Sequence, residues 1–316
     1  MVIIKTPLRI SLFGGSTDYE SFYKIHGSFL IGTTIDKYSY LSMRFRPKIL
    51  SKESIVMYSK MECVKHLDNI SNPLIREVLR YKKVKEYIEF CSFADIPSRT
   101  GLGGSSSYSI GLLYLIDQLY GRETDKKTLI KDAITIERTI LHEAGGIQDH
   151  IWPLYGGLNS IEIDTNGKFR VKPLPITREF YEELEQSVVL IYTNEQRNQE
   201  NIARSHDGKD KLRILDISRQ SYNYFLKENL KGIGELLYET WKEKRQLSSL
   251  ISNAKIDQII NIVMQRGAYG AKLLGSGGCG FILIICNPKV KKVLTTVFKN
   301  DILPIKFDSQ GVSRIY

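Results

Sequence analysis

Cysteine is scarce in this sequence, and long runs of hydrophobic residues are absent. The 316 residues include four cysteines, none of them in CxxC spacing, at Cys63, Cys91, Cys279 and Cys286. Neither a zinc site nor a disulfide framework is therefore indicated. The longest apolar run, Phe281 to Cys286, is too short to span a bilayer, and the N-terminus lacks a charged region ahead of an apolar stretch. We expect a cytoplasmic protein with no membrane partner.

Several signatures of catalysis and of RNA binding are missing too. The segment HEAGG at His142 lacks the second histidine of a zinc-binding HExxH motif, and no serine, histidine and aspartate spacing points to acyl transfer. The formal net charge is +10, with basic clusters at Arg80 to Lys85 and Lys289 to Lys292. These clusters are either a solvated surface or a field that attracts anionic substrates. Because no RNA-reading motif accompanies them, we expect no nucleic-acid partner.

The order of predicted strands and helices indicates an α+β protein of two domains. Two prolines and a charged stretch over residues 178–186 mark the expected boundary between an N-terminal domain, residues 1–176, and a C-terminal domain, residues 177–316. At the start of the chain we expect two short strands, Val2 to Lys5 and Leu8 to Phe13.

A GxGxxG pattern at Gly275, Gly277 and Gly280 would on its letters indicate a dinucleotide site. Such a site requires a strand before the glycines and a helix after them. Apolar spacing instead predicts a helix over Ile256 to Leu274 and a buried strand over Gly280 to Cys286. We therefore reject a Rossmann fold.

The most informative segment is a glycine- and serine-rich loop that begins at Pro97 and runs into an apolar helix predicted over Ser107 to Tyr120. Gly103 and Gly104 have no side chains to shield their backbone amides, and three serines follow them. Bare amides, hydroxyls and the free N–H groups of a helix start form a cradle for anions, and phosphate is the expected ligand. The usual phosphate loop GxxxxGK[ST] is missing, since no lysine follows the glycines. We therefore expect a different nucleotide-binding fold.

One glutamate is predicted to be buried. In the helix expected over Lys126 to His142, residues spaced about 100° apart place Glu137 in the middle of the apolar face, among Ile130, Ala133 and Ile140. A buried carboxylate must be protonated, paired or bound to a metal, because a bare one is costly. An ion pair with a core arginine and a metal site are both consistent with this position.

Three motifs together resemble the GHMP kinase superfamily, which includes galactokinase, homoserine kinase and mevalonate kinase. They are TPLRISLFGGSTDY at Thr6 to Tyr19, PSRTGLGGSSS at Pro97 to Ser107 and AKLLGSGGCG at Ala271 to Gly280. The resemblance implies an N-terminal domain like part of a small ribosomal protein, a ferredoxin-like C-terminal domain, and an active site between them that uses ATP and Mg²⁺. PLRIS, FGGSTD and GGIQDH are most similar to kinases that phosphorylate the anomeric C1 hydroxyl of D-glycero-D-manno-heptose 7-phosphate.

The resemblance implies that Asp149 and Arg9 are catalytic. In the family, the aspartate of GGIQDH faces the acceptor hydroxyl, where it takes the proton or orients the nucleophile. An aspartate beside glycine is otherwise a common turn or helix-capping residue. Similar kinases carry lysine or arginine at the position of Arg9, near the transferred phosphate, whereas a strand arginine opposite an apolar face is usually exposed.

The resemblance also implies ligands for ATP and metal. Glu137 matches a glutamate that binds Mg²⁺, and we choose Ser105 for the serine on the same ion. Ser106 is the adjacent candidate, because Gly104 departs from the family pattern GLGSS. The predicted ATP-binding residues are Pro97, Gly101, Leu102, Gly103, Gly104, Ser105, Ser106 and Ser107.

Acceptor binding is implied for Thr17 and Asp18, since galactokinase uses an aspartate there to hydrogen-bond sugar hydroxyls. Asp18 is also a natural N-cap for the helix expected to follow it. A distal phosphate needs cations, for which Arg197 and Arg204 are candidates unless both lie on a helix surface. The glycines expected to close over the substrate and its phosphates are Gly275, Gly277 and Gly278.

These features predict a sugar kinase, a phosphotransferase with an alcohol group as acceptor. The sequence does not determine the oligomeric state, and a homodimer is one candidate. A kinase for fucose, galactose or another hexose is the main alternative, although Gly15 and Ser16 replace the acidic and histidine residues that precede TDY in galactokinases. A second alternative is a non-catalytic sugar or nucleotide sensor on the same fold. The presence of both Arg9 and Asp149 argues against a sensor, because a binding protein needs no base.

Overall fold

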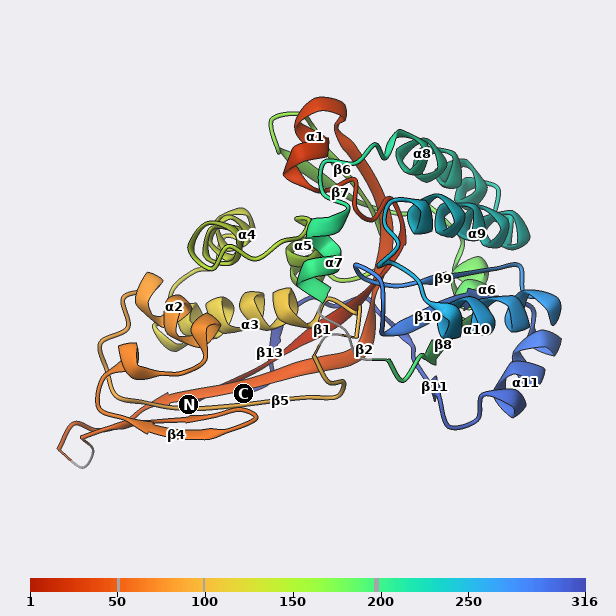
Figure 1. Cartoon of the computed structure of the whole chain (residues 1–316). Helices are drawn as coiled ribbons and strands as arrows, with labels where there is room; N and C mark the ends of the chain where they lie inside the picture. Colours follow the sequence, from red (N-terminus) through yellow and green to blue (C-terminus); the bar gives the residue numbers. More distant parts are fainter. Residues whose placement is uncertain (50–51, 99, 196–198) are drawn as a thin grey trace.

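Two β-sheets form the framework of the computed structural model, which describes residues 1–49, 52–98, 100–195 and 199–316 (Figure 1). Within these residues the larger sheet has nine strands, mostly from the N-terminal half, and the smaller sheet has four from the C-terminal half. Most strand pairs are antiparallel, and helices pack on both sheets. The predicted α+β class is confirmed.

Two long antiparallel strands, β1 (Val2–Phe13) and β2 (Ser28–Phe45), form the centre of the larger sheet. The prediction of two short strands at the N-terminus was therefore wrong, because the chain continues as one strand through Pro7. The register between β1 and β2 shifts between Pro7 and Leu8, and such an irregularity is where a sheet tolerates proline. The other strands of this sheet are β3 (Ser54–Met57), β4 (Met61–Val64), β5 (Ile88–Ala94), β6 (Asn159–Ile163), β7 (Phe169–Pro173), β12 (Phe307–Asp308) and β13 (Ser313–Arg314).

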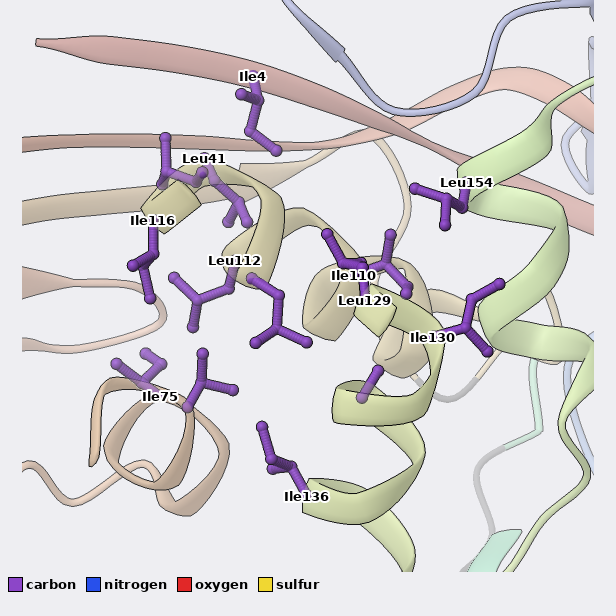
Figure 2. Packing of buried hydrophobic residues seen from close by; sticks show 14 of the residues in the cluster. Ile4, Leu41, Ile75, Ile110, Leu112, Ile116, Leu129, Ile130, Ile136 and Leu154 are labelled. Atoms are coloured by element: carbon purple, nitrogen blue, oxygen red, sulfur yellow. The ribbon is translucent and has the colours of Figure 1, made fainter. Parts of the chain in front are cut away.

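The helix α3 (Gly104–Leu119) is the buried centre of the N-terminal half and packs on β1 and β2. Figure 2 shows Ile110, Leu112 and Ile116 of this helix among side chains of the sheet and of neighbouring helices. Gly111 permits the close approach, since a Cβ there would stand 2.5 Å from Thr6 Oγ1. The helices α2 (Pro73–Tyr81), α4 (Lys126–Ile134) and α5 (Gln148–Tyr155) pack against α3. The other helices of this half are α1 (Glu20–His26), η1 (Leu67–Asn69) and η2 (Thr135–Ile140).

The smaller sheet has the antiparallel order β11-β8-β10-β9. The helix predicted over Ile256 to Leu274 was too long, because it ends at Gln265 and residues 270–273 form a strand. Gly267 follows the helix at a φ of 89°, a left-handed conformation that ends helices. A strand therefore does precede the glycine cluster, but another strand follows it, so the Rossmann fold is still excluded. The elements here are β8 (Val188–Tyr192), β9 (Gly270–Leu273), β10 (Phe281–Ile285), β11 (Ile302–Leu303), α6 (Arg178–Ser187), α7 (Gln199–Ser205), α8 (Leu212–Leu226), α9 (Leu230–Gln246), α10 (Ala254–Gln265) and α11 (Pro288–Val297).

The two halves share a core, and the C-terminal half adds two strands to the larger sheet. Residues 178–186, expected to mark a boundary, lie in α6, and β12 and β13 return to pair with β2 and β1 in the larger sheet. One hydrophobic cluster contains Phe13 of β1 together with Leu190 and Phe225 of the C-terminal half. Ile3 N donates to Tyr316 O at 2.9 Å, so the two termini lie side by side (Figure 1). None of the helices in the described ranges is both long and apolar enough to cross a bilayer.

Candidate active site

A cavity of about 930 Å³ lies between the two halves of the chain. We call its two sides the N-terminal wall and the C-terminal wall. The N-terminal wall includes Arg9, Ser16, Tyr19, Gly103, Glu137, Gln148 and Asp149, and the C-terminal wall includes Ala203, Thr240, Lys244, Lys272, Gly275 and Ser276.

Arg9 and Asp149 form a two-point ion pair on the N-terminal wall. Arg9 Nε and Nη2 each donate to one carboxylate oxygen of Asp149 at 2.8 Å, and Nη1 donates to Gly101 O at 2.6 Å. Arg9 lies on β1 and is 4% exposed, whereas a strand arginine opposite an apolar face is usually exposed. The side chain of Asp149 is 27% exposed and lines the cavity. Asp149 lies in the first turn of α5, but its carboxylate is held by Arg9. The pair thus joins β1, the loop before α3 and α5.

Neighbouring charges favour the ionised form of Asp149. Burial by itself would raise the pKa of Asp149, but the charge and hydrogen bonds of Arg9, together with the charges of His150 and Arg138, hold that pKa below its usual range. Asp149 is therefore an ionised acceptor of hydrogen bonds at neutral pH. A guanidinium has five N–H donors, of which three are used here within the described residues. Two donors of Arg9 therefore have no partner among the described residues.

The glycine and serine loop forms the start of α3, three residues earlier than predicted. Gly103 is the N-cap residue at a φ of 75°, and a Cβ there would lie 3.0 Å from the Arg9 side chain. Of the predicted ATP-binding residues, those that line the cavity are Pro97, Gly101, Gly103, Gly104, Ser105 and Ser106. Leu102 instead lies in the hydrophobic core, and Ser107 Oγ donates to Pro7 O at 2.7 Å.

Glu137 is 1% exposed, so its predicted burial is confirmed. Its Oε2 accepts from Ser106 Oγ at 3.1 Å and lies 2.9 Å from His150 Nε2, while the arginine beside it, Arg138, is 3.9 Å away. Burial alone would raise the pKa of Glu137, but His150 and then Arg138 and Ser106 lower it. Ser106 is buried against this carboxylate, whereas Ser105 is exposed at the same turn.

The helix that carries Glu137 differs from the predicted one. It runs as α4 to Ile134 and continues as the π-helix η2, in which Leu141 N bonds Ile136 O. The wider turn places Ile136 in the core and leaves Ile140 39% exposed, so the 100° spacing failed beyond Ile134. Short π-helical segments often occur at functional sites.

Thr17 and Asp18 are fully buried behind the cavity surface. Asp18 accepts hydrogen bonds from Ser16 N, Gln148 N and Gln148 Nε2 at 2.9–3.1 Å, and Thr17 Oγ1 donates to Gly14 O at 2.7 Å. Asp18 does not cap α1. The N-cap residue of this helix is Tyr19, whose side chain makes no capping hydrogen bond. Burial, followed by the charge of Asp149, raises the pKa of Asp18 to about 6. Asp18 thus holds the start of α5, and a sugar contact for it stays a prediction.

The second glycine cluster is divided between the cavity and the protein interior. Gly275 lines the cavity and packs against Gly101, where a Cβ would come within 2.5 Å. Gly277 and Gly278 lie behind it against Ile251, whose carbonyl accepts from Gly278 N at 2.8 Å. The predicted closure over the substrate stays a prediction for all three glycines.

Sequence reasoning missed several cavity residues. Lys244 and Lys272 are buried on the C-terminal wall, and Tyr58, Phe93 and Tyr108 also line the cavity. Each lysine occupies a position among buried apolar neighbours of a helix or strand, and this is the sequence pattern that marks it. Of the predicted phosphate ligands, Arg204 is exposed and donates to His142 O at 2.7 Å, while Arg197 lies outside the described residues.

Comparison with known proteins agrees with this architecture. The family description "GHMP kinases N terminal domain" matches residues 72–157, and "GHMP kinases C terminal" matches residues 223–300. D-glycero-alpha-D-manno-heptose 7-phosphate kinase of Campylobacter jejuni is 26% identical over 98% of this chain and 97% of its own length. The galactokinase of Pyrococcus furiosus is 22% identical over 92% of this chain and 91% of its own. A crystal structure described as a D-glycero-D-manno-heptose 1-phosphate kinase of Bacteroides thetaiotaomicron superposes with a TM-score of 0.82, 22% identity and coverage of 100% and 99%.

The fold and the matching family descriptions define a phosphotransferase, a class whose members in this fold take the phosphoryl group from ATP. The chain belongs to the GHMP kinase superfamily, and the resemblance carried by its three sequence motifs is confirmed.

Proposed function

We propose that this chain is an ATP-dependent sugar kinase that phosphorylates the anomeric C1 hydroxyl of D-glycero-D-manno-heptose 7-phosphate and releases the 1,7-bisphosphate. Support for the acceptor comes from the Campylobacter jejuni relative, which carries that substrate in its name and matches almost end to end. Support for the reaction comes from the site itself.

The Arg9 and Asp149 pair is the observation that carries the proposal. It places an ionised, partly exposed carboxylate on the same wall as the N-terminus of α3, where free amides favour phosphate. In the proposed step the C1 oxygen attacks the γ-phosphorus and a new O–P bond forms. The bond from the γ-phosphorus to the bridging oxygen breaks, and ADP leaves with its electron pair.

The proton of the C1 hydroxyl passes to Asp149. Because Arg9 lowers the pKa of Asp149, this carboxylate is a weak base in the resting enzyme. It therefore orients the hydroxyl first and takes the proton late, when the forming O–P bond makes that hydroxyl strongly acidic. Arg9 stays charged throughout, and its free donors stabilise negative charge on the transferred phosphoryl group.

Mg²⁺ fits the residues around Glu137. Glu137 Oε1 is buried and has no hydrogen-bond partner among the described residues, and Ser106 Oγ contacts the other oxygen. Oxygen ligands of this kind, completed by substrate phosphates and water, suit Mg²⁺. When bound, the ion would neutralise charge on the phosphates. We propose Glu137 and Ser106 as its protein ligands, with Ser105 as the second serine candidate.

Incubation with MgATP and D-glycero-D-manno-heptose 7-phosphate, followed by ³¹P NMR, tests the proposal. We expect a new anomeric phosphate signal that grows in step with ADP, and no such signal with the Asp149→Asn variant. If ATP stays intact with the heptose but is consumed with fucose, galactose or another free hexose, the acceptor assignment is wrong and the kinase assignment stands. If ATP is consumed with none of these sugars, the non-catalytic sensor is favoured.

A further inference from the structure

Two buried lysines on the C-terminal wall take no part in the chemistry described above. Lys244 lies on α9 and is 5% exposed, and Lys272 lies on β9 and is 4% exposed. Both line the cavity together with Arg9 and Asp149. They come from different elements, so their shared position is a product of the tertiary fold.

Each lysine contacts only backbone oxygen within the described part of the chain. Lys244 Nζ donates to Gly275 O, and Lys272 Nζ donates to Leu12 O at 2.8 Å. In the described ranges no carboxylate lies within 4.0 Å of either ammonium group. An ammonium has three donors, so most of the hydrogen-bonding capacity of both groups is unused.

Burying these two groups is unfavourable without an anion. Burial, followed by the charge of Arg9, lowers the pKa of Lys244 to about 8, although Asp149 and Asp18 oppose the shift. Burial, followed by the charges of Lys244 and Arg9, lowers the pKa of Lys272 well below its usual value. A hydrophobic residue of similar length would fill either position at a smaller cost. The lysines are therefore better explained by a ligand than by packing.

A third buried lysine, Lys211, belongs to the same half of the chain but does not line the cavity. Lys211 is 1% exposed, and its Nζ lies 5.1 Å from the ring centre of Tyr19, without a hydrogen-bond partner among the described residues. Burial, followed by the charges of Lys244 and Lys211, lowers the pKa of His206 to about 4, so both lysines lie near the same imidazole.

We propose that Lys244 and Lys272 bind the phosphate that the acceptor already carries, at the end of the sugar away from the reacting hydroxyl. This inference rests on the proposed function. The phosphates of ATP have their own partners on the N-terminal wall, in the amides of α3 and the free donors of Arg9. A phosphate dianion matches two ammonium groups in charge. A sugar without that phosphate would leave both lysines desolvated and unpaired, so the same residues select for a phosphorylated acceptor.

Steady-state kinetics with the Lys244→Met and Lys272→Met variants test the selectivity. In each we expect the KM for D-glycero-D-manno-heptose 7-phosphate to rise about ten- to hundredfold, with little change in the KM for MgATP. The preference for this substrate over the unphosphorylated heptose should fall by the same factor. Lys242→Met is the matched control, since Lys242 lies on the same helix and is exposed, and it should behave as the parent. A rise in the KM for MgATP with the acceptor preference unchanged would overturn the inference.

Binding of inorganic phosphate separates this inference from the proposed function. The protein is first saturated with a non-hydrolysable ATP analogue and Mg²⁺, and phosphate is then titrated by calorimetry. We expect binding to the parent and to Lys242→Met, and at least tenfold weaker binding to Lys244→Met. Equal binding to all three proteins, or none to the parent, would overturn the subsite. Phosphate binding that depends on Lys244, without turnover of the heptose phosphate, would support the subsite and refute the proposed acceptor.

Discussion

The two walls of the cavity differ in how their charged side chains are paired. On the N-terminal wall Arg9 and Asp149 hold each other at 2.8 Å, and Glu137 has Ser106 and His150 beside it. On the C-terminal wall Lys244 and Lys272 have backbone oxygens as partners. Charges that are paired in the fold are oriented before the ligand arrives, whereas cations without a counter-ion are stabilised by it. In the proposed function, the N-terminal wall serves phosphoryl transfer and the C-terminal wall selects the substrate.

The largest effect should come from removing charge at Asp149. Asp149→Asn keeps the shape of the side chain but loses the acceptor for the hydroxyl proton, so kcat should fall about a thousandfold. The amides of α3 are untouched, and ATP affinity measured by calorimetry should stay close to that of the parent. Full activity in this variant would refute the assignment of Asp149.

The ion pair should also matter for stability. Arg9→Met leaves Asp149 without its partner, so we expect the free energy of unfolding, measured with urea, to fall by about 3–5 kcal/mol. Arg44→Met is the matched control, because Arg44 pairs with Glu89 on the surface with 57% of its side chain exposed, and such pairs contribute little. Equal losses in the two variants would contradict the contrast between buried and exposed pairs.

Removing the charge of a lysine on the opposite wall should raise the free energy of unfolding instead of lowering it. Burial, followed by Arg9, lowers the pKa of Lys244 from 10.5 to about 8, so at pH 7 the folded state carries the whole cost of a buried ammonium. Lys244→Met should therefore stabilise the fold at pH 7 by about 1–3 kcal/mol, allowing for the lost hydrogen bond to Gly275. Above pH 8 the folded protein releases this proton before the unfolded chain does, and the advantage of the variant should shrink towards pH 10. Urea unfolding at pH 7, 9 and 10 measures the trend, and a stability difference that does not vary with pH would contradict it.

The smallest effect should distinguish the two serines of the loop. Ser106 Oγ contacts Glu137, whereas Ser105 is exposed. We expect Ser106→Ala to weaken Mn²⁺ binding in the presence of an ATP analogue about tenfold, measured by electron paramagnetic resonance. Ser105→Ala should bind Mn²⁺ as the parent does. The opposite result would favour Ser105 as the metal ligand.

Local patterns were sufficient for some features and insufficient for others. The glycine- and serine-rich loop was expected to run into an apolar helix, which α3 confirms, and the apolar neighbours of Glu137 predicted its burial. The anion cradle at Gly103 and Gly104 stays a prediction. The π-helical turn at residues 135–140 and the strand at residues 270–273 escaped prediction. Helical periodicity assumes a constant number of residues per turn, and the end of α10 depended on the conformation of Gly267.

The amino-acid sequence by itself determined the fold class and the kinase superfamily, because both can be recognised from patterns of neighbouring residues along the chain. Only the tertiary structure decided which charges meet. Arg9 and Asp149 are 140 positions apart, and Lys272 reaches Leu12 across 260. The pKa of Asp149 and the positions of the lysines on the opposite wall depend on distances between strands and helices far apart in sequence. Packing within each half, as well as between the halves, sets those distances.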